Sequence, residues 1–141
     1  MADLDFAILA DYVRAENGLL HLIAGGVDTI YTERVPAVQN LGLGLRFLLT
    51  PGETGRTHAL EIIFQDEDGE RIFETTADVT PVRPSNHTPG ERIGFLAALN
   101  LFLPLPREGR YSFEILFNGT NLKTIPLAVR VGIPTRPLPE A

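Results

Sequence analysis

Apolar and polar residues alternate along most of this chain with a period of two, the spacing that predicts β-strands with one buried face. The clearest run spans residues 41–49, where Leu41, Leu43, Leu45 and Phe47 share one face and the residues between them share the other. Comparable runs cover residues 58–64, 93–103, 111–117 and 125–131. The alternation therefore predicts antiparallel sheets that pack on one face and meet solvent on the other.

Turn-forming residues separate these runs at intervals of roughly 8–12 residues, a spacing typical of all-β domains. Asn17-Gly18 and Asn118-Gly119 favour the positive φ angles of two-residue hairpins. Further turns are predicted at residues 51–55, 66–69 and 106–109. The fold class that we predict is an all-β antiparallel sandwich of about seven to eight strands, with immunoglobulin-like or similar Greek-key topology.

Four segments need separate interpretation. Residues 4–13 fit a strand with Leu4, Phe6 and Ile8 on one face, or a short amphipathic helix, and we favour the strand because a hairpin signal follows. Gly25-Gly26 predicts a bend where the chain changes sheet. Residues 80–92 form a polar loop whose length suggests binding or mobility. We expect one domain over residues 1–131 and a proline-rich tail over 132–141.

Composition narrows the classes of function. The 141-residue chain carries a net charge of −6 and contains no cysteine. An acidic surface opposes binding to nucleic acid and to anionic membranes, and the missing thiols exclude disulfides and thiolate metal sites. The first residues are acidic, unlike a signal peptide, and no run is long and apolar enough to span a membrane, so we expect a cytoplasmic protein.

Candidate chemistry is sparse. Asp66 and Asp68 lie in an acidic loop tip that offers oxygen ligands for calcium, but Asp and Gly are equally typical of a plain turn. The three histidines are too far apart in sequence to suggest one metal site, and His58 fits a structural role at a strand end. Neither serine lies in a nucleophile motif. We therefore expect no cofactor and no catalytic site.

Apolar residues on outward-facing strand positions point instead to contacts with protein. Phe102 and Leu96 alternate away from the core face of their strand, as Leu48 and Ile63 do on theirs. Such a face is covered by a partner subunit, by the proline tail or by the N-terminal segment. We expect partner contacts at Phe102 and Leu96, and at Arg83 and His87 in the 80–92 loop.

The chain also resembles a family of small bacterial domains of unknown function that is frequent in actinobacteria. The resemblance rests on the N-terminal Met-Ala-Asp-Leu-Asp-Phe-Ala, on residues 25–30, on residues 106–115, on Asn118-Gly119 and on Ile125-Pro126-Leu127. It implies a stand-alone β-sandwich in the cytoplasm and no known activity.

The leading functional hypothesis is a non-enzymatic binding or assembly module that acts through protein–protein contacts or self-association. The alternative is a calcium- or small-ligand-binding sandwich that uses the Asp66 loop. An enzyme with an unrecognised site is the third hypothesis, and it requires a concave pocket with perturbed titratable groups.

Overall fold

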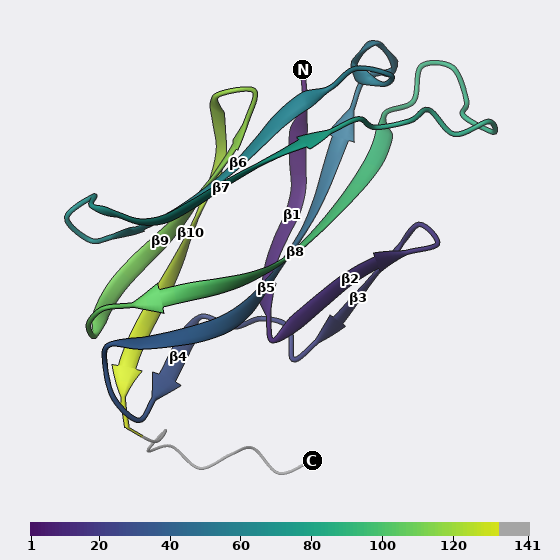
Figure 1. Cartoon of the computed structure of the whole chain (residues 1–141). Helices are drawn as coiled ribbons and strands as arrows, with labels where there is room; N and C mark the ends of the chain where they lie inside the picture. Colours follow the sequence, from purple (N-terminus) through teal and green to yellow (C-terminus); the bar gives the residue numbers. More distant parts are fainter. Residues whose placement is uncertain (133–141) are drawn as a thin grey trace.

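The computed structural model describes residues 1–132, and within this range the chain forms ten β-strands and one short 3₁₀ helix (Figure 1). The strands are β1 (Asp3–Ala10), β2 (Tyr12–Glu16), β3 (Leu19–Ile23), β4 (Thr29–Thr32), β5 (Ala37–Leu49), β6 (His58–Asp66), β7 (Arg71–Val79), β8 (Ile93–Leu105), β9 (Gly109–Phe117) and β10 (Thr120–Val131). The all-β class is confirmed, but the expected seven to eight strands are too few. The short strands β2 to β4 were too brief to show a clear alternation.

The strands form two large sheets and one separate hairpin. One sheet has the order β1-β5-β8 and the other β4-β10-β9-β6-β7, while β2 pairs only with β3 among the described strands. All neighbours run antiparallel except β4 and β10, which are parallel. The bend predicted at Gly25-Gly26 lies where the chain leaves the β2–β3 hairpin for the five-stranded sheet. The predicted tail at 132–141 lies, beyond Gly132, outside the described residues.

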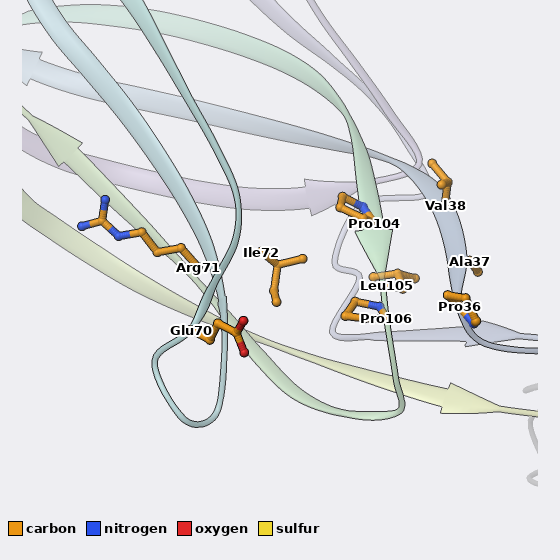
Figure 2. Close-up of a pocket in the computed structure, with 9 residues that line it drawn as sticks. All are labelled: Pro36, Ala37, Val38, Glu70, Arg71, Ile72, Pro104, Leu105 and Pro106. Atoms are coloured by element: carbon orange, nitrogen blue, oxygen red, sulfur yellow. The ribbon is translucent and has the colours of Figure 1, made fainter.

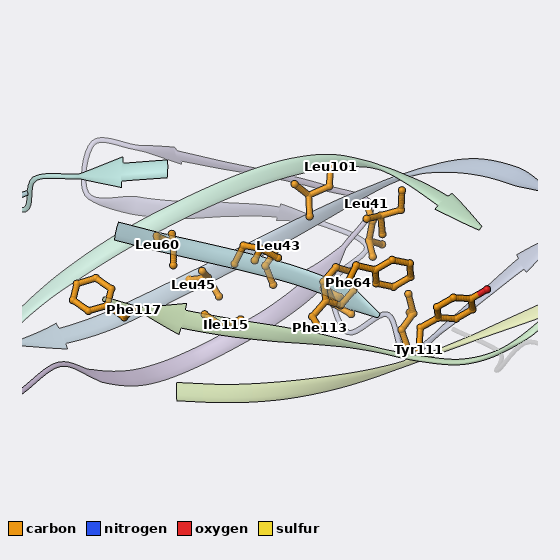
Figure 3. Close-up of a cluster of buried hydrophobic side chains, with 14 of the residues drawn as sticks. Leu41, Leu43, Leu45, Leu60, Phe64, Leu101, Tyr111, Phe113, Ile115 and Phe117 are labelled. Atoms are coloured by element: carbon orange, nitrogen blue, oxygen red, sulfur yellow. The ribbon is translucent and has the colours of Figure 1, made fainter. Parts of the chain in front are cut away.

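The hydrophobic core lies between the two large sheets, which each contribute the apolar face of their strands (Figure 3). Leu43, Leu45 and Phe47 of β5 are completely buried, as the alternation over residues 41–49 predicts. The ring of Phe47 lies 5.1 Å from that of Phe117 on β9, across the space between the sheets. Burial of a side chain of this size stabilises the fold by about 1.5–3 kcal/mol.

A β-bulge changes the faces of β1. The strand interpretation is confirmed, but the prediction that Leu4, Phe6 and Ile8 share one face is wrong. The register shifts between Leu4 and Phe6, so Leu4 pairs with the inward Phe47 while Ile8 pairs with Gly44 on the outer face. An extra residue in one strand reverses the side-chain alternation beyond it.

The β2–β3 hairpin covers part of the outer face of the three-stranded sheet. Its residue Val13 packs over Gly42, and the Val13 backbone exchanges hydrogen bonds of 3.1 and 2.8 Å with the Asn100 amide on β8. Leu20 lies against Gly44, where the missing side chain leaves room for it. We expected a partner subunit, the proline tail or the N-terminal segment to cover this face. Within residues 1–132, the N-terminal segment covers part of it.

Both Asn-Gly turns adopt the predicted positive φ angles, 53° and 73° at residues 17–18 and 51° and 81° at residues 118–119. The Asn118 carboxamide accepts a hydrogen bond from the Ala59 amide and donates one of 2.8 Å to Nδ1 of His58. Nε2 of His58 lies 2.6 Å from the carbonyl oxygen of Glu53. His58 is therefore a buried structural residue. Within residues 1–132 no helix has the length and apolar character to cross a membrane.

Candidate functional site

A mostly apolar pocket of about 630 Å³ lies where the start of β5, the start of β7 and the end of β8 meet (Figure 2). We call it the edge pocket, because its walls come from β7 and β8, which lie at the edges of the two large sheets. The pocket is lined by the start of β5, the start of β7 and the end of β8: Pro36, Ala37, Val38, Glu70, Arg71, Ile72, Pro104, Leu105 and Pro106. Apolar side chains and proline rings make up most of this lining.

Asp66 holds the β7 wall of the edge pocket in place. Its Oδ1 accepts hydrogen bonds of 2.9 Å from the backbone amides of Asp68 and Glu70, which fixes the turn between β6 and β7. Its Oδ2 pairs with the guanidinium of Arg107, which directly follows the pocket residue Pro106. One carboxylate therefore connects the two walls of the pocket.

Tyr111 fixes the other end of this connection. Its hydroxyl donates a hydrogen bond of 2.7 Å to the carbonyl oxygen of Arg107, and its ring stacks on Phe64 at 4.9 Å. A tyrosine at the start of a strand that bonds back to the preceding loop is the arrangement known as a tyrosine corner. The loop that carries Pro106 and Arg107 is thereby anchored to the core.

The electrostatics of Asp66 follow from these contacts. Its side chain is only 2% exposed. Burial alone raises the pKa of a carboxyl group, but the Glu70 and Asp68 amides and the Arg107 guanidinium outweigh it and lower the pKa of Asp66 below its ordinary value. The hydrogen bond to Asp66 in turn raises the pKa of Arg107. The pair is charged at neutral pH.

These contacts leave the Asp66 oxygens engaged by protein donors. A calcium ion at Asp66 would have to displace the Arg107 guanidinium and two backbone amides, so the geometry does not favour the calcium hypothesis. Across residues 1–132, no group of three histidine or acidic side chains is arranged to hold a metal ion.

The edge pocket is suited to apolar groups. The charged residues in its lining are Glu70 and Arg71, and Nη1 of Arg71 is bound to Glu74 at 2.9 Å. A volume of this size and a mostly apolar wall are typical of sites that receive a hydrophobic side chain or a small ligand. A ligand would therefore bind there mainly through burial of apolar surface.

Comparison with known proteins places the chain in a family. The family of unknown function DUF6941 matches residues 5–130. The chain belongs to DUF6941. No curated protein matches it significantly. Membership in DUF6941 confirms the predicted resemblance to a family without known function.

The structure of this DUF6941 domain does not bring the expected partner residues together. Arg83 and His87 line a hollow of about 330 Å³ beside Pro51. His87 Nε2 lies 2.7 Å from the carbonyl oxygen of Glu91, so the ring stabilises the 80–92 loop. This loop precedes β8, whereas the edge pocket lies at the end of β8.

Leu96 and Phe102 lie apart from each other on the outer face of β8. Leu96 is half-buried and borders a hollow of about 260 Å³ next to Ala15 and Gly18 of the β2–β3 hairpin. Phe102 is 69% exposed. The alternation along residues 93–103 thus identifies Phe102 correctly as an uncovered apolar residue.

Sequence reasoning missed the edge pocket itself. Val38 is 67% exposed and pairs with Pro104. Pro104 is two residues after Phe102, so both lie on the outer face of β8. Val38 precedes the alternating run at 41–49, so the alternation does not place it on a strand face. The prolines at 36, 104 and 106 are the signal in the sequence, since proline gathers at strand ends and edges.

Proposed function

We propose that this DUF6941 domain is a non-enzymatic binding or assembly module that contacts other protein chains through the side of the molecule formed by β7, β8 and the start of β5. We call this side the open side and define it by the edge pocket, Val38 and Phe102. Its function is to bury these apolar groups against a protein partner. We propose that the domain does so in the cytoplasm.

The observation that carries the proposal is the exposure of Val38 and Phe102 beside the edge pocket. The two residues are diagonal neighbours on the outer face of paired strands β5 and β8. Exposed aromatic residues beside an apolar pocket are typical of the anchor positions of protein interfaces. Burial of these groups against a partner would be favourable, because it removes apolar surface from water.

The fold supports a binding role of this kind. We infer an immunoglobulin-like Greek-key sandwich, because strands β1-β5-β8 and β10-β9-β6-β7 follow the spatial order expected of such sheets and Tyr111 forms a tyrosine corner at the start of β9. Sandwiches of this type host unrelated functions, so the open side supports the proposed function more strongly than the fold does.

Site-specific photo-crosslinking tests the proposal. A benzophenone amino acid replaces Phe102 in one variant and Tyr31 in a matched control, since Tyr31 is a 45% exposed aromatic on β4, at the far edge of the other sheet. The expected result is a discrete crosslinked protein product from position 102 in the native host, and none from position 31. Absence of a product from position 102, or equal products from both positions, would contradict the proposal.

A further inference from the structure

Four strands lie at the edges of the two large sheets, and three of them carry features that oppose pairing with another chain. These features are charge, bulges and shortness. β1 has Asp3, Asp5 and a bulge, β7 has Arg71, Glu74 and Asp78, and β4 has only four residues. β8 has 13 residues, none of them charged, and Pro104 near its end.

The same edge borders incompletely covered core surface. Within residues 1–132, a three-stranded sheet faces a five-stranded one, and no strand pairs with the outer edge of β8. Three inward-facing residues of β8, Phe95, Ala97 and Leu99, pack on the core but remain only half-buried. Phe73 on β7 is likewise half-buried. A strand added beside β8 would cover this surface.

A pairing centred on Leu99 would bring the apolar residues on the outer face of β8 opposite each other. Phe102 lies three residues after Leu99, and Leu96, with its adjoining hollow, lies three residues before it. If two β8 strands pair antiparallel with the two Leu99 residues opposite each other, Phe102 lies opposite the partner's Leu96. Paired residues share a face in antiparallel sheets, so both side chains stay on the outer face.

We propose that a second copy of this chain pairs antiparallel along β8, centred on Leu99, and joins two three-stranded sheets into one of six strands. Each Phe102 then packs on the partner's Leu96 and its hollow, and residue 92 at the end of one 80–92 loop lies opposite the partner's Pro106 at the edge pocket. The inference rests on the proposed function and names its partner.

Mass measurement in solution tests the pairing. Analytical ultracentrifugation of the untagged chain from about 1 to 100 μM is expected to show a dimer of twice the 15.5 kDa chain mass. Phe102→Lys places a charge at the paired strand and is expected to weaken the dimer at least tenfold. Tyr31→Lys is the matched control, because Tyr31 is an exposed aromatic residue on β4, at the far edge of the other sheet, and it is expected to keep the dimer. Circular dichroism establishes that both variants fold.

A cysteine test fixes the register, since the chain has no cysteine of its own. Leu99→Cys is expected to form a disulfide-linked dimer under mild oxidation, because the two residues lie directly opposite each other. Ala97→Cys is expected to stay unlinked. In this register the two copies of residue 97 lie four residues apart along the strands, about 13 Å, and a disulfide requires α-carbons within roughly 7 Å.

Two results would overturn the inference: a wild-type chain that stays monomeric at every concentration, or a dimer that resists Phe102→Lys and forms no disulfide through Leu99→Cys. A crosslink from position 102 to a different protein would then support the proposed function with a partner other than a second copy. If position 102 crosslinks to nothing, the proposed function fails as well.

Discussion

At the scale of single residues, Asp66 shows how a residue that suggests metal binding acts as a structural connector. An acidic loop tip in a sequence is compatible with calcium or with a turn, and the difference depends on which donors reach the carboxylate. Here the donors are two amides of its own turn and Arg107, which is 41 positions away. Residues 66–69 reveal the turn but carry no information about Arg107.

The lowered pKa of Asp66 leads to a pH-dependent prediction. The ordinary aspartate pKa is about 3.9, and a folded-state pKa below it means that the ionised carboxylate adds stability above that pH, which is lost as the pH falls through the folded-state value. Asp66→Asn keeps an acceptor for the two amides but loses the charge that binds Arg107. We expect this variant to unfold more easily at pH 7.

The stability difference between wild type and Asp66→Asn should shrink as the pH falls below about 4, and urea unfolding at several pH values measures it. Asp68→Asn is the control, because Asp68 contributes its backbone amide to the turn rather than its carboxylate. A difference between wild type and Asp66→Asn that is the same at pH 7 and pH 2 would show that the Arg107 ion pair contributes nothing.

At the scale of elements, the β2–β3 hairpin depends on two glycines of β5. A β-carbon at Gly42 would lie 2.9 Å from the Val13 backbone nitrogen, and one at Gly44 would lie 2.8 Å from a terminal methyl of Leu20. The first contact involves backbone held by the Asn100 hydrogen bonds, and the second involves the flexible end of a side chain. A side chain at residue 42 would therefore push the hairpin backbone, whereas one at residue 44 would only require Leu20 to rotate.

We predict that Gly42→Ala destabilises the domain by about 1–3 kcal/mol, because the hairpin must move away from the sheet. Gly44→Ala should cost less, since Leu20 can rotate and alanine reduces the entropy of the unfolded chain by about 0.4–1 kcal/mol. Urea denaturation midpoints of the two variants test this order. Equal losses, or a larger loss for Gly44→Ala, would contradict the packing described for the hairpin.

The elements also show what sequence alone can predict. Long runs such as β5 and β8 follow from alternation, and the Asn-Gly hairpins follow from local backbone preference, because both signals are contained in neighbouring residues. The bulge at Asp5, the hairpin cover over Gly42 and the edge pocket depend on contacts between distant segments. The alternation of its own strand predicts that Phe102 points outward, whereas the outward position of Val38 depends on its pairing with Pro104 on a distant strand.

At the scale of the whole molecule, the open side favours association of two copies, whereas the charge of the chain opposes it. Each copy carries a net charge of −6, so two copies repel each other, while the uncharged β8 offers apolar contact. A dimer formed along β8 therefore has to overcome long-range repulsion with short-range burial. The outer face of the five-stranded sheet would form an interface of a different kind, because Glu61 and Glu114 lie there on β6 and β9 and Arg130 lies on β10.

Salt distinguishes these interfaces, because the Debye length falls from about 10 Å at 0.1 M to about 3 Å at 1 M. Screening removes the repulsion between the two acidic copies and leaves apolar burial intact, so the β8 dimer should tighten several-fold across this range. An interface that pairs glutamates with arginines would weaken instead, since screening reduces its attraction. Sedimentation of the wild-type chain in sodium chloride at constant pH measures the dissociation constant, and a dimer that weakens with salt would contradict pairing along the uncharged β8.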